Sequence, residues 1–292
     1  MPSIVTGVIA SLLLFLNIMF WCPLLFLFTF FKIVLPFAPV RRLITRLLNG
    51  IANNWISCNS GWMWLTQKMD WSIQLPDNLN RNGWYFVISN HQSWVDILVL
   101  QHALNRKIPL LKFFLKQELI KVPVMGAAWW ALDFPFMKRY SKAYLEKYPE
   151  KKGQDLETTR KACEKFRTLP TSVMNFLEGT RFEQRKHDEQ QSPFQHLLKP
   201  KAGGMAFAMS AMGEQFHSIL DVTIHYPDCV PTFWEFLQGK MKRCTVIVEE
   251  KPIPQALRSG DYENDEHYRN LFQQWVQDLW ESKDAKLNAL SA

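Results

Sequence analysis

The hydrophobic pattern begins with one long apolar stretch. The first charged side chain is Lys32, and apolar residues then resume until Arg41. A helix rises about 1.5 Å per residue, so residues 1–40 are long enough to cross the roughly 30 Å hydrocarbon core of a bilayer. The same stretch could instead break near Pro23 into two pieces that enter and leave one leaflet. Because Arg41 and Arg42 follow on its C-terminal side, the positive-inside rule places the rest of the chain in the cytoplasm.

A cleaved signal peptide is the alternative interpretation of this stretch. Such a peptide begins with a positively charged segment, whereas residues 2–7 contain no basic side chain. The apolar run is also longer than the hydrophobic part of a signal peptide. We therefore expect residues 1–40 to remain in the protein as a membrane-anchoring helical segment.

The next segment mixes large aromatic and small polar residues. Residues 51–65 contain Trp55, Trp62 and Trp64 among asparagine, serine and glycine. This pattern predicts an amphipathic helix at the membrane interface, and it fits an ordinary buried helix equally well. We assign residues 41–80 to this helix and a linker.

Beyond residue 80, short apolar runs alternate with helical patterns. Helical patterns occupy residues 96–104 and 201–212, and apolar residues recur at helical spacing from Tyr268 to Leu279. The runs with strand character are residues 84–89, 172–176, 219–226 and 244–249. This alternation predicts an α/β fold with a mixed, largely parallel sheet flanked by helices. We assign residues 81–255 to this domain and 256–292 to a C-terminal packing helix.

Composition and charge narrow the class of protein. Hydrophobic residues make up 48% and charged residues 21%, which excludes a disordered chain. The net charge of +7 indicates an anionic partner such as a membrane surface, a phosphate group or nucleic acid. The 12 tryptophans are typical of a protein at a membrane interface. The densely charged residues 138–167 predict a solvated helical surface, or a face against anionic headgroups.

The cysteines and the glycines exclude several kinds of site. The five cysteines are scattered and form no C-x-x-C pair, so we expect reduced thiols and no zinc ribbon or disulfide framework. The sequence also lacks a P-loop and a G-x-G-x-x-G motif, which leaves nucleotide hydrolysis and hydride transfer without support.

The first chemical motif is residues 89–96, which directly follow the strand-like run 84–89. His91 and Asp96 are five residues apart, and such residues lie about 140° apart around a helix. They can therefore meet only if His91 precedes the helix and Asp96 lies in its first turn, with Ser93 as the N-cap. Asp96 would then fix the imidazole tautomer and leave the other nitrogen of His91 as a general base. The alternative is a capping box without catalytic meaning, since Ser93-x-x-Asp96 also fits that pattern.

The second motif is Glu178-Gly179-Thr180-Arg181, which follows the strand-like run 172–176. Its glycine permits a tight turn with positive φ. An arginine on a turn at a strand end suits a phosphate, because the guanidinium group binds phosphate through two parallel hydrogen bonds. An ion-paired surface turn would have the same sequence.

Taken together, the two motifs resemble those of the glycerolipid acyltransferase family. This family comprises the 1-acylglycerol-3-phosphate acyltransferases and related lysophospholipid acyltransferases, and the resemblance covers roughly residues 84–226. Residues 90–96 resemble the first family motif and residues 178–181 the third. Weaker matches are residues 116–119, 134–139 and 199–204.

The resemblance implies a direct acyl transfer. His91, oriented by Asp96, would deprotonate the sn-2 hydroxyl of lysophosphatidic acid, and the alkoxide would attack the thioester of acyl-CoA or acyl carrier protein to give phosphatidic acid. We expect no metal and no bound cofactor. Glu178 would shape its loop or contact the acceptor. The residues implied for the acceptor phosphate site are Lys116, Arg139, Glu178, Gly179, Thr180 and Arg181.

The chain departs from the family pattern at three places. Leu177 replaces the usual proline, Pro135 replaces an isoleucine or valine, and the fourth motif is barely recognisable in residues 220–227. The acceptor could therefore be another lysophospholipid, of the lysophosphatidylglycerol or lysocardiolipin type. The pattern is similar to that of a bacterial inner-membrane branch of the family.

The expected partners are membrane lipids, the lysophospholipid and the acyl donor, and not nucleic acid, with the catalytic domain on the cytoplasmic face of the inner membrane. A rival hypothesis is a non-catalytic, membrane-tethered protein that recruits anionic lipid or nucleic acid through its basic surface.

Overall fold

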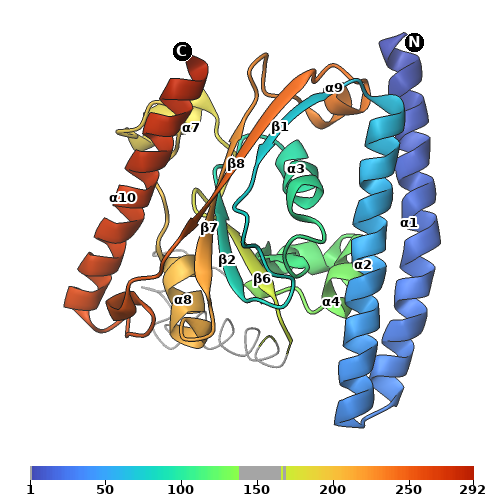
Figure 1. The fold of residues 1–292 in the computed structure, drawn as a ribbon, viewed down its shortest axis with the longest axis horizontal. Helices are drawn as coiled ribbons and strands as arrows, with labels where there is room; N and C mark the ends of the chain where they lie inside the picture. The colour runs from blue at the N-terminus through green and yellow to red at the C-terminus, as the bar shows by residue number, and fades with distance from the viewer. Residues whose placement is uncertain (1, 138–165, 167–168) are drawn as a thin grey trace.

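A six-stranded sheet forms the centre of the molecule, with the strand order β1-β8-β7-β2-β6-β3 (Figure 1). This is a computed structural model, which describes residues 2–137, 166 and 169–292. Neighbouring strands are parallel except for β7 and β8, which are antiparallel. The strands are β1 (Asp70–Gln74), β2 (Tyr85–Ser89), β3 (Leu111–Phe113), β6 (Ser172–Phe176), β7 (Ser218–His225) and β8 (Arg243–Lys251).

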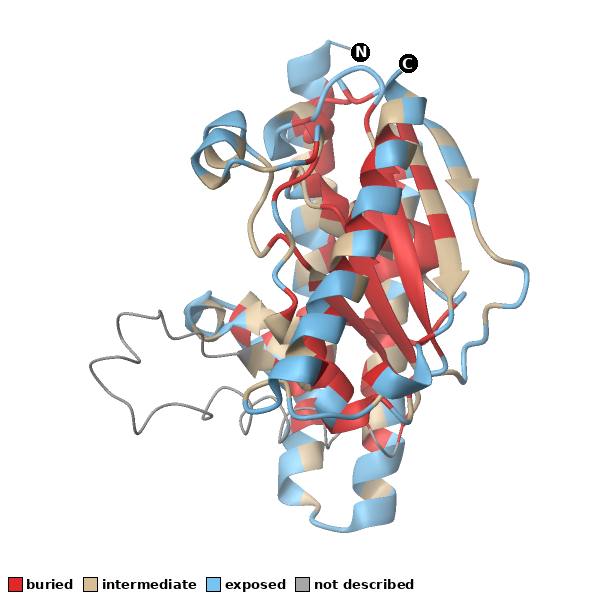
Figure 2. Cartoon of the chain, turned by 90° about the vertical axis from the view of Figure 1, so that its left-hand side faces the viewer, coloured by how far each residue is buried: buried red, intermediate tan, exposed pale blue. Residues whose placement is uncertain are grey.

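Helices cover both faces of this sheet, because its central strands are apolar on both sides. Along β2, Tyr85 and Val87 belong to one hydrophobic cluster, while Phe86 and Ile88 belong to the other. The first cluster packs against α2 (Ala38–Thr66) and α3 (Val95–Leu104). The second packs against α8 (Gly203–Met212) and α10 (Glu266–Ser291). Figure 2 shows the buried strands enclosed between these layers.

The predicted fold class is confirmed. The four predicted strand runs are β2, β6, β7 and β8, and the predicted helical patterns are α3, α8 and α10. The edge strands β1 and β3 were not predicted. Strand β1 has alternating exposed and half-buried residues, and β3 is only three residues long, so neither gives a strong signal. Strand β1 lies within residues 41–80, so the sheet takes an edge strand from the segment assigned to a helix and linker.

The N-terminal segment forms an antiparallel helix pair. Helix α1 (Ser3–Val34) runs unbroken through Pro23, and the chain reverses just after it, where Pro36 disfavours helix at the preceding residue. Helix α2 then returns along α1 and includes the amphipathic residues 51–65. Inside the pair, Asn17 Nδ2 donates to Asn59 Oδ1 at 2.7 Å, and Trp62 Nε1 donates to the same oxygen at 3.0 Å. This polar contact sets the register of two otherwise apolar helix faces.

The helix pair also packs on the α/β domain. Near the start of α1, Gly7 lies against Trp234 of α9 (Phe233–Leu237). Near its end, the Lys32 ammonium forms an ion pair with Asp133 at 2.5 Å, just after α4 (Met125–Ala131). A small second sheet, of β4 (Leu115–Lys116) and β5 (Phe136–Met137), lies in the same part of the chain.

Helix α10 is joined to the sheet by a buried ion pair. Lys283 pairs with Asp221 of β7, and both side chains are fully buried. The Lys283 ammonium also donates to the carbonyl oxygen of Val222 at 2.6 Å. Burial raises the pKa of Asp221, but Lys283 and Lys251, whose ammonium lies 3.2 Å from the other oxygen, together hold that pKa below the usual value. Removing either partner would therefore leave a buried charge poorly compensated.

We expect the Lys283→Met substitution to lower the free energy of unfolding by about 3–5 kcal/mol, because Asp221 loses its closest cation. The double variant Asp221→Leu/Lys283→Met should recover most of that loss, since it buries no charge. The control Lys286→Met removes a partly exposed pair with Glu249 and should cost about 1 kcal/mol or less. Denaturant titration in detergent measures all three values. Equal losses in the single and double variants would contradict this account.

Candidate active site

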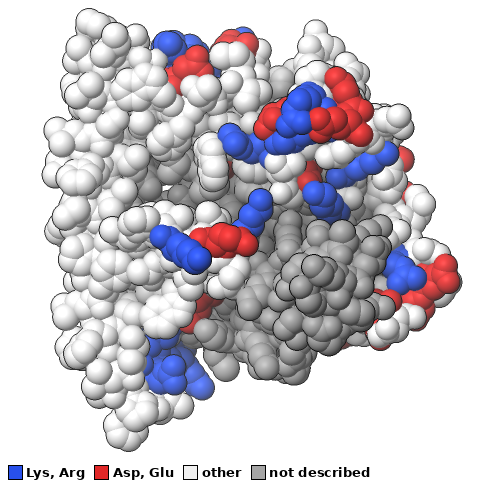
Figure 3. All heavy atoms as spheres, turned by 180° about the vertical axis from the view of Figure 1, so that it is seen from behind, with Lys and Arg blue, Asp and Glu red and all other residues white. Residues whose placement is uncertain are grey.

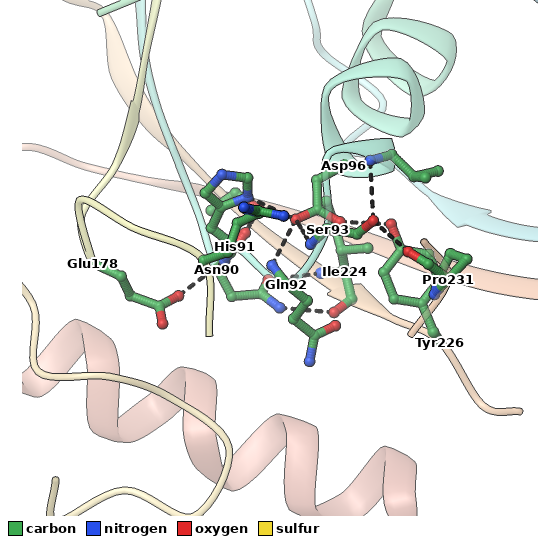
Figure 4. A network of polar contacts seen from close by, with 12 residues as sticks. Asn90, His91, Gln92, Ser93, Asp96, Glu178, Ile224, Tyr226 and Pro231 are labelled. Atoms are coloured by element: carbon green, nitrogen blue, oxygen red, sulfur yellow. Dashed lines mark hydrogen bonds and ion pairs between the residues drawn. The ribbon is translucent and has the colours of Figure 1, made fainter. Parts of the chain in front are cut away.

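The His-x4-Asp motif lies where β2 ends at the sheet edge. His91 is on the loop between β2 and α3, and Asp96 is in the first turn of α3, as predicted. His91 Nδ1 lies 2.8 Å from Asp96 Oδ2 (Figure 4). The carboxylate is fully buried and the imidazole is 12% exposed. Asp96 can therefore accept a hydrogen bond from the Nδ1–H group, which leaves Nε2 as the basic nitrogen.

Asp96 accepts three further hydrogen bonds. The backbone N–H groups of Gln92 and Ser93 donate to its Oδ2 at 2.6 and 2.9 Å, and the Tyr226 hydroxyl donates to its Oδ1 at 2.6 Å. Burial, followed by the charge of Asp96, raises the pKa of Tyr226, so this hydroxyl stays a donor. These donors stabilise the ionised carboxylate and hold it in one orientation.

Ser93 does not occupy the predicted N-cap position. Helix α3 begins at Val95 and Trp94 is its N-cap residue, so the prediction was displaced by one residue. The Ser93 hydroxyl accepts from the N–H of Val95 at 3.2 Å and donates to the Pro231 carbonyl at 2.5 Å. Because Asp96 also accepts the N–H of Ser93, its carboxylate stabilises the start of the helix as well as contacting His91. The capping interpretation and the catalytic one are therefore compatible.

Neighbouring strands hold the loop that carries His91. The Asn90 side chain exchanges two hydrogen bonds with the backbone of Ile224 on β7, at 2.8 and 2.9 Å. The His91 ring stacks on Phe176 at the end of β6, with centroids 3.8 Å apart and an interplanar angle of 12°. The imidazole is thus fixed by β6 on one side and by Asp96 on the other.

The Glu178 side chain points inward and binds the backbone of two loops. Its side chain is 1% exposed, and its two oxygens accept the backbone N–H groups of His91 at 2.9 Å and Leu198 at 3.0 Å. Burial raises the pKa of Glu178 to about 8, although both N–H groups lower it. These contacts fit the loop-shaping role and not the alternative in which Glu178 contacts the acceptor.

The rest of the second motif forms the turn beside His91. Gly179 has a φ of 69°, as its predicted turn requires, and the N–H of Phe182 donates to the His91 carbonyl at 2.7 Å. The Arg181 guanidinium carbon lies 4.9 Å from the centre of the Trp94 ring, a cation–π contact. His91 and Glu178 are 87 residues apart in the sequence, and their hydrogen bond brings the two motifs into one site.

The structure adds two residues that the sequence did not indicate. The Lys186 ammonium donates to the Thr180 hydroxyl at 2.9 Å, which brings a second cation to the turn. Tyr226 lies in the weak fourth motif. Besides that motif, its position directly after β7 could have indicated it, because the carboxyl ends of neighbouring parallel strands lie at the same end of the sheet.

For the other predicted phosphate ligands, the structure describes no contact with His91. Lys116 is an exposed residue of β4, on the small second sheet. Arg139 lies outside the described residues, as does most of the charged stretch 138–167. Their roles stay predictions.

The fold and the site together define an enzyme class. A largely parallel sheet carries a His–Asp base at the carboxyl end of a central strand, and an arginine-containing turn follows the adjacent strand. This is the arrangement of an O-acyltransferase of the His-x4-Asp type. A family model described as Acyltransferase matches residues 70–227, more than half of the chain. The protein belongs to this acyltransferase family, and the non-catalytic alternative is thereby disfavoured.

Individual relatives agree with this assignment. The 1-acyl-sn-glycerol-3-phosphate acyltransferase 3 of Arabidopsis thaliana is 24% identical over 283 residues, which cover 88% of this chain and 67% of the relative. The delta enzyme of Homo sapiens is 24% identical over 213 residues, which cover 68% of this chain and 51% of that protein. The chain thus spans between half and two thirds of these relatives.

A solved structure shares the fold. The crystal structure of a 1-acyl-sn-glycerophosphate (LPA) acyltransferase from Thermotoga maritima superposes with a TM-score of 0.53 at 15% identity, over 99% of this chain and all of that one. The similarity therefore extends to the helix pair and α10, which the family model does not cover.

We expect Tyr226→Phe to lower kcat by about tenfold, because a buried Asp96 oxygen loses its donor and the imidazolium loses support. Steady-state kinetics with a lysophospholipid acceptor measure the effect. The matched control is Tyr268→Phe. It also removes a buried tyrosine hydroxyl, but that hydroxyl donates to the carbonyl oxygen of Leu257 and not to a residue of the site. Similar kcat values for the wild type and Tyr226→Phe would show that this hydrogen bond has no part in orienting Asp96.

Proposed function

We propose that the protein transfers a fatty acyl group from acyl-CoA or acyl carrier protein to the sn-2 hydroxyl of lysophosphatidic acid, giving phosphatidic acid. The observation that carries the proposal is the His91–Asp96 pair, fixed beside the Arg181 turn on one sheet edge. The printed names of the relatives, which are 1-acyl-sn-glycerol-3-phosphate acyltransferases, support this acceptor.

In the proposed reaction, His91 acts through Nε2. It accepts the proton of the acceptor hydroxyl while that oxygen attacks the thioester carbonyl carbon. The carbon–sulfur bond of the resulting tetrahedral intermediate then breaks, and the thiolate leaves with the proton from the imidazolium. Asp96 holds the Nδ1 proton and stabilises the imidazolium in both steps. The reaction as proposed requires an activated acyl donor and neither a metal nor a bound cofactor.

The turn after β6 supplies the charge for the acceptor phosphate. Arg181 is on this turn, and Lys186 lies in the following helix α7 (Gln184–Gln190), where it also pairs with Glu183. A phosphate between the two cations would receive charge-assisted hydrogen bonds. Lys116 and Arg139 are proposed as further ligands on the strength of the family resemblance. Because Trp94 supports the guanidinium face, Arg181 keeps its N–H edges for the phosphate.

An apolar cavity of about 180 Å³ supports a lipid substrate. Its walls come from α1, α2, α3 and α4, and they are almost wholly apolar. Ile97 and Leu98, which line it, are the two residues that follow Asp96 in α3, so the cavity and the His91–Asp96 pair share one helix. Hydrocarbon is the chemical class that such a cavity accepts.

The first experiment is acyl transfer in detergent micelles, with labelled acyl-CoA or acyl carrier protein and a panel of lysophospholipids. We expect product from lysophosphatidic acid with the wild type and none above background with His91→Ala. If only another lysophospholipid gave product, that lipid would replace lysophosphatidic acid as the proposed acceptor. If no combination of donor and acceptor gave product, the proposed function would be wrong.

In the same assay, Arg181→Ala should raise the acceptor KM by about tenfold or more, since a charge-assisted contact is worth about 1.5–3 kcal/mol. The control is Arg185→Ala, a nearby surface arginine that pairs with Glu189. An unchanged acceptor KM in Arg181→Ala would remove this residue from the phosphate site.

We further propose that α1 lies within one leaflet, on the cytoplasmic face of the inner membrane. Among the residues that the structure describes, α1 is the one helix that could cross a bilayer by length and composition. However, the α/β domain packs on it near both ends, at Gly7 and at Lys32, so a perpendicular crossing would draw that domain into the hydrocarbon. Large apolar side chains are exposed along the whole outer face of α1: Ile4, Val8, Leu12, Phe15, Met19, Leu27, Phe30 and Val34. In Figure 3 the side formed by the helix pair accordingly shows few charged groups.

Cysteine labelling tests this orientation. In a background with Cys58, Cys163 and Cys229 changed to serine, Ser3→Cys and Arg42→Cys should react with an impermeant maleimide from the same, cytoplasmic side of sealed vesicles. Ser3 is the first residue of α1 and Arg42 is near the start of α2, just past the other end of α1, so a helix across the membrane would place Ser3→Cys on the far side. Labelling of the two cysteines from opposite sides would therefore exclude the single-leaflet arrangement.

A further inference from the structure

One face of the C-terminal helix α10 contacts the loop between residues 194 and 198. The Asp284 carboxylate accepts two consecutive backbone N–H groups of this loop, those of Gln195 and His196, each at 2.8 Å. One turn earlier, Trp280 Nε1 donates to the Leu198 carbonyl at 3.1 Å. Trp280 is fully buried and Asp284 is 8% exposed, so these bonds form largely out of water.

The same loop holds Glu178, and Glu178 holds the catalytic histidine. The N–H of Leu198 donates to one Glu178 oxygen, and the other oxygen accepts the N–H of His91. The Leu198 carbonyl therefore accepts a hydrogen bond from Trp280 of α10, and the Leu198 N–H donates one to Glu178. This continuous series of buried hydrogen bonds links α10 to the backbone of the residue that acts as base.

Helix α10 is itself fixed to the sheet that carries the site. Lys283, between Trp280 and Asp284, pairs with Asp221 and donates to the Val222 carbonyl, both on β7. Asn90, next to His91, is hydrogen-bonded to Ile224 on the same strand. The loop that carries His91 is thus hydrogen-bonded to β7 through Asn90 and linked to α10 through Glu178 and Leu198. Helix α10 is itself bonded to β7 through Lys283.

We infer that Asp284 and Trp280 are positioning residues for the acyl transfer, which hold His91 in its reactive place through the 194–198 loop and Glu178. The inference rests on the proposed function for its kinetic test. It assigns a catalytic contribution to a helix that begins at Glu266, beyond the end of the family match at residue 227. A base displaced by a fraction of an ångström reacts more slowly with an acceptor that still binds normally.

The test compares Asp284→Asn with the matched control Asp278→Asn, an exposed aspartate on the outer face of the same helix. Asparagine keeps the shape of Asp284 but turns an NH2 group toward one of the two loop N–H groups, which then lacks an acceptor. We expect kcat of Asp284→Asn to fall by about tenfold or more, with both KM values within about twofold of the wild type. The control should keep the wild-type kcat.

Hydrogen–deuterium exchange provides a readout that needs no activity. In Asp284→Asn the peptide spanning residues 89–95 should exchange faster, because the N–H of His91 is less firmly bound to Glu178, while strand β8 keeps its wild-type protection. If the wild type proves inactive, the proposed function fails, but this comparison still tests the link from α10 to His91.

Trp280→Phe is a second variant, for the case in which Asp284→Asn does not fold. It removes only the indole N–H to Leu198 and keeps most of the packing, so we expect the same pattern of effects with a smaller fall in kcat. An unchanged kcat in a folded variant, unchanged exchange at residues 89–95, or faster exchange spread evenly over the chain would each overturn the inference.

Discussion

The carboxylate of Asp96 is the group around which the site is organised. It is fully buried, and its negative charge is stabilised by four donors that come from two parts of the chain. The loop after β2 supplies the imidazole of His91 and the backbone N–H groups of the two following residues, and the segment after β7 supplies the hydroxyl of Tyr226. A buried carboxylate without such partners would be too costly to keep ionised. The need to satisfy it therefore fixes the path of the loop after β2 and the approach of the segment after β7.

The base lies at the meeting point of the two helical layers of the sheet. On one side, α3 supplies Asp96 and continues into the walls of the apolar cavity, whose other walls are the N-terminal helix pair and α4. On the other side, α10 reaches the site through the 194–198 loop and Glu178. The apolar cavity and the C-terminal helix thus lie on opposite faces of the sheet that carries this imidazole.

Two buried acidic groups on the α10 side are stabilised in different ways. Asp221 is paired with Lys283, which keeps it ionised despite complete burial. Glu178 receives two backbone N–H groups, and its pKa is raised to about 8 by burial. Because each Glu178 oxygen accepts one N–H group, the ionised carboxylate is the form that satisfies both donors, and protonation of one oxygen would weaken one of the two hydrogen bonds.

The sequence alone determined the features that depend on local pattern. The apolar N-terminus, the four inner strands and the three long helical patterns follow from periodicity and from buried runs such as residues 84–89. The His-x4-Asp spacing and the Glu-Gly-Thr-Arg turn identified the family and predicted which residues meet at the site, because these motifs are carried by residues close together in the chain. Only the tertiary structure decided what depends on partners distant in sequence. It brought Tyr226 onto Asp96 and joined β1 to β8. It also turned Glu178 inward and made α10 part of the site's support. These contacts join segments separated by many residues, and no local periodicity encodes which of them the packing of the sheet will place together.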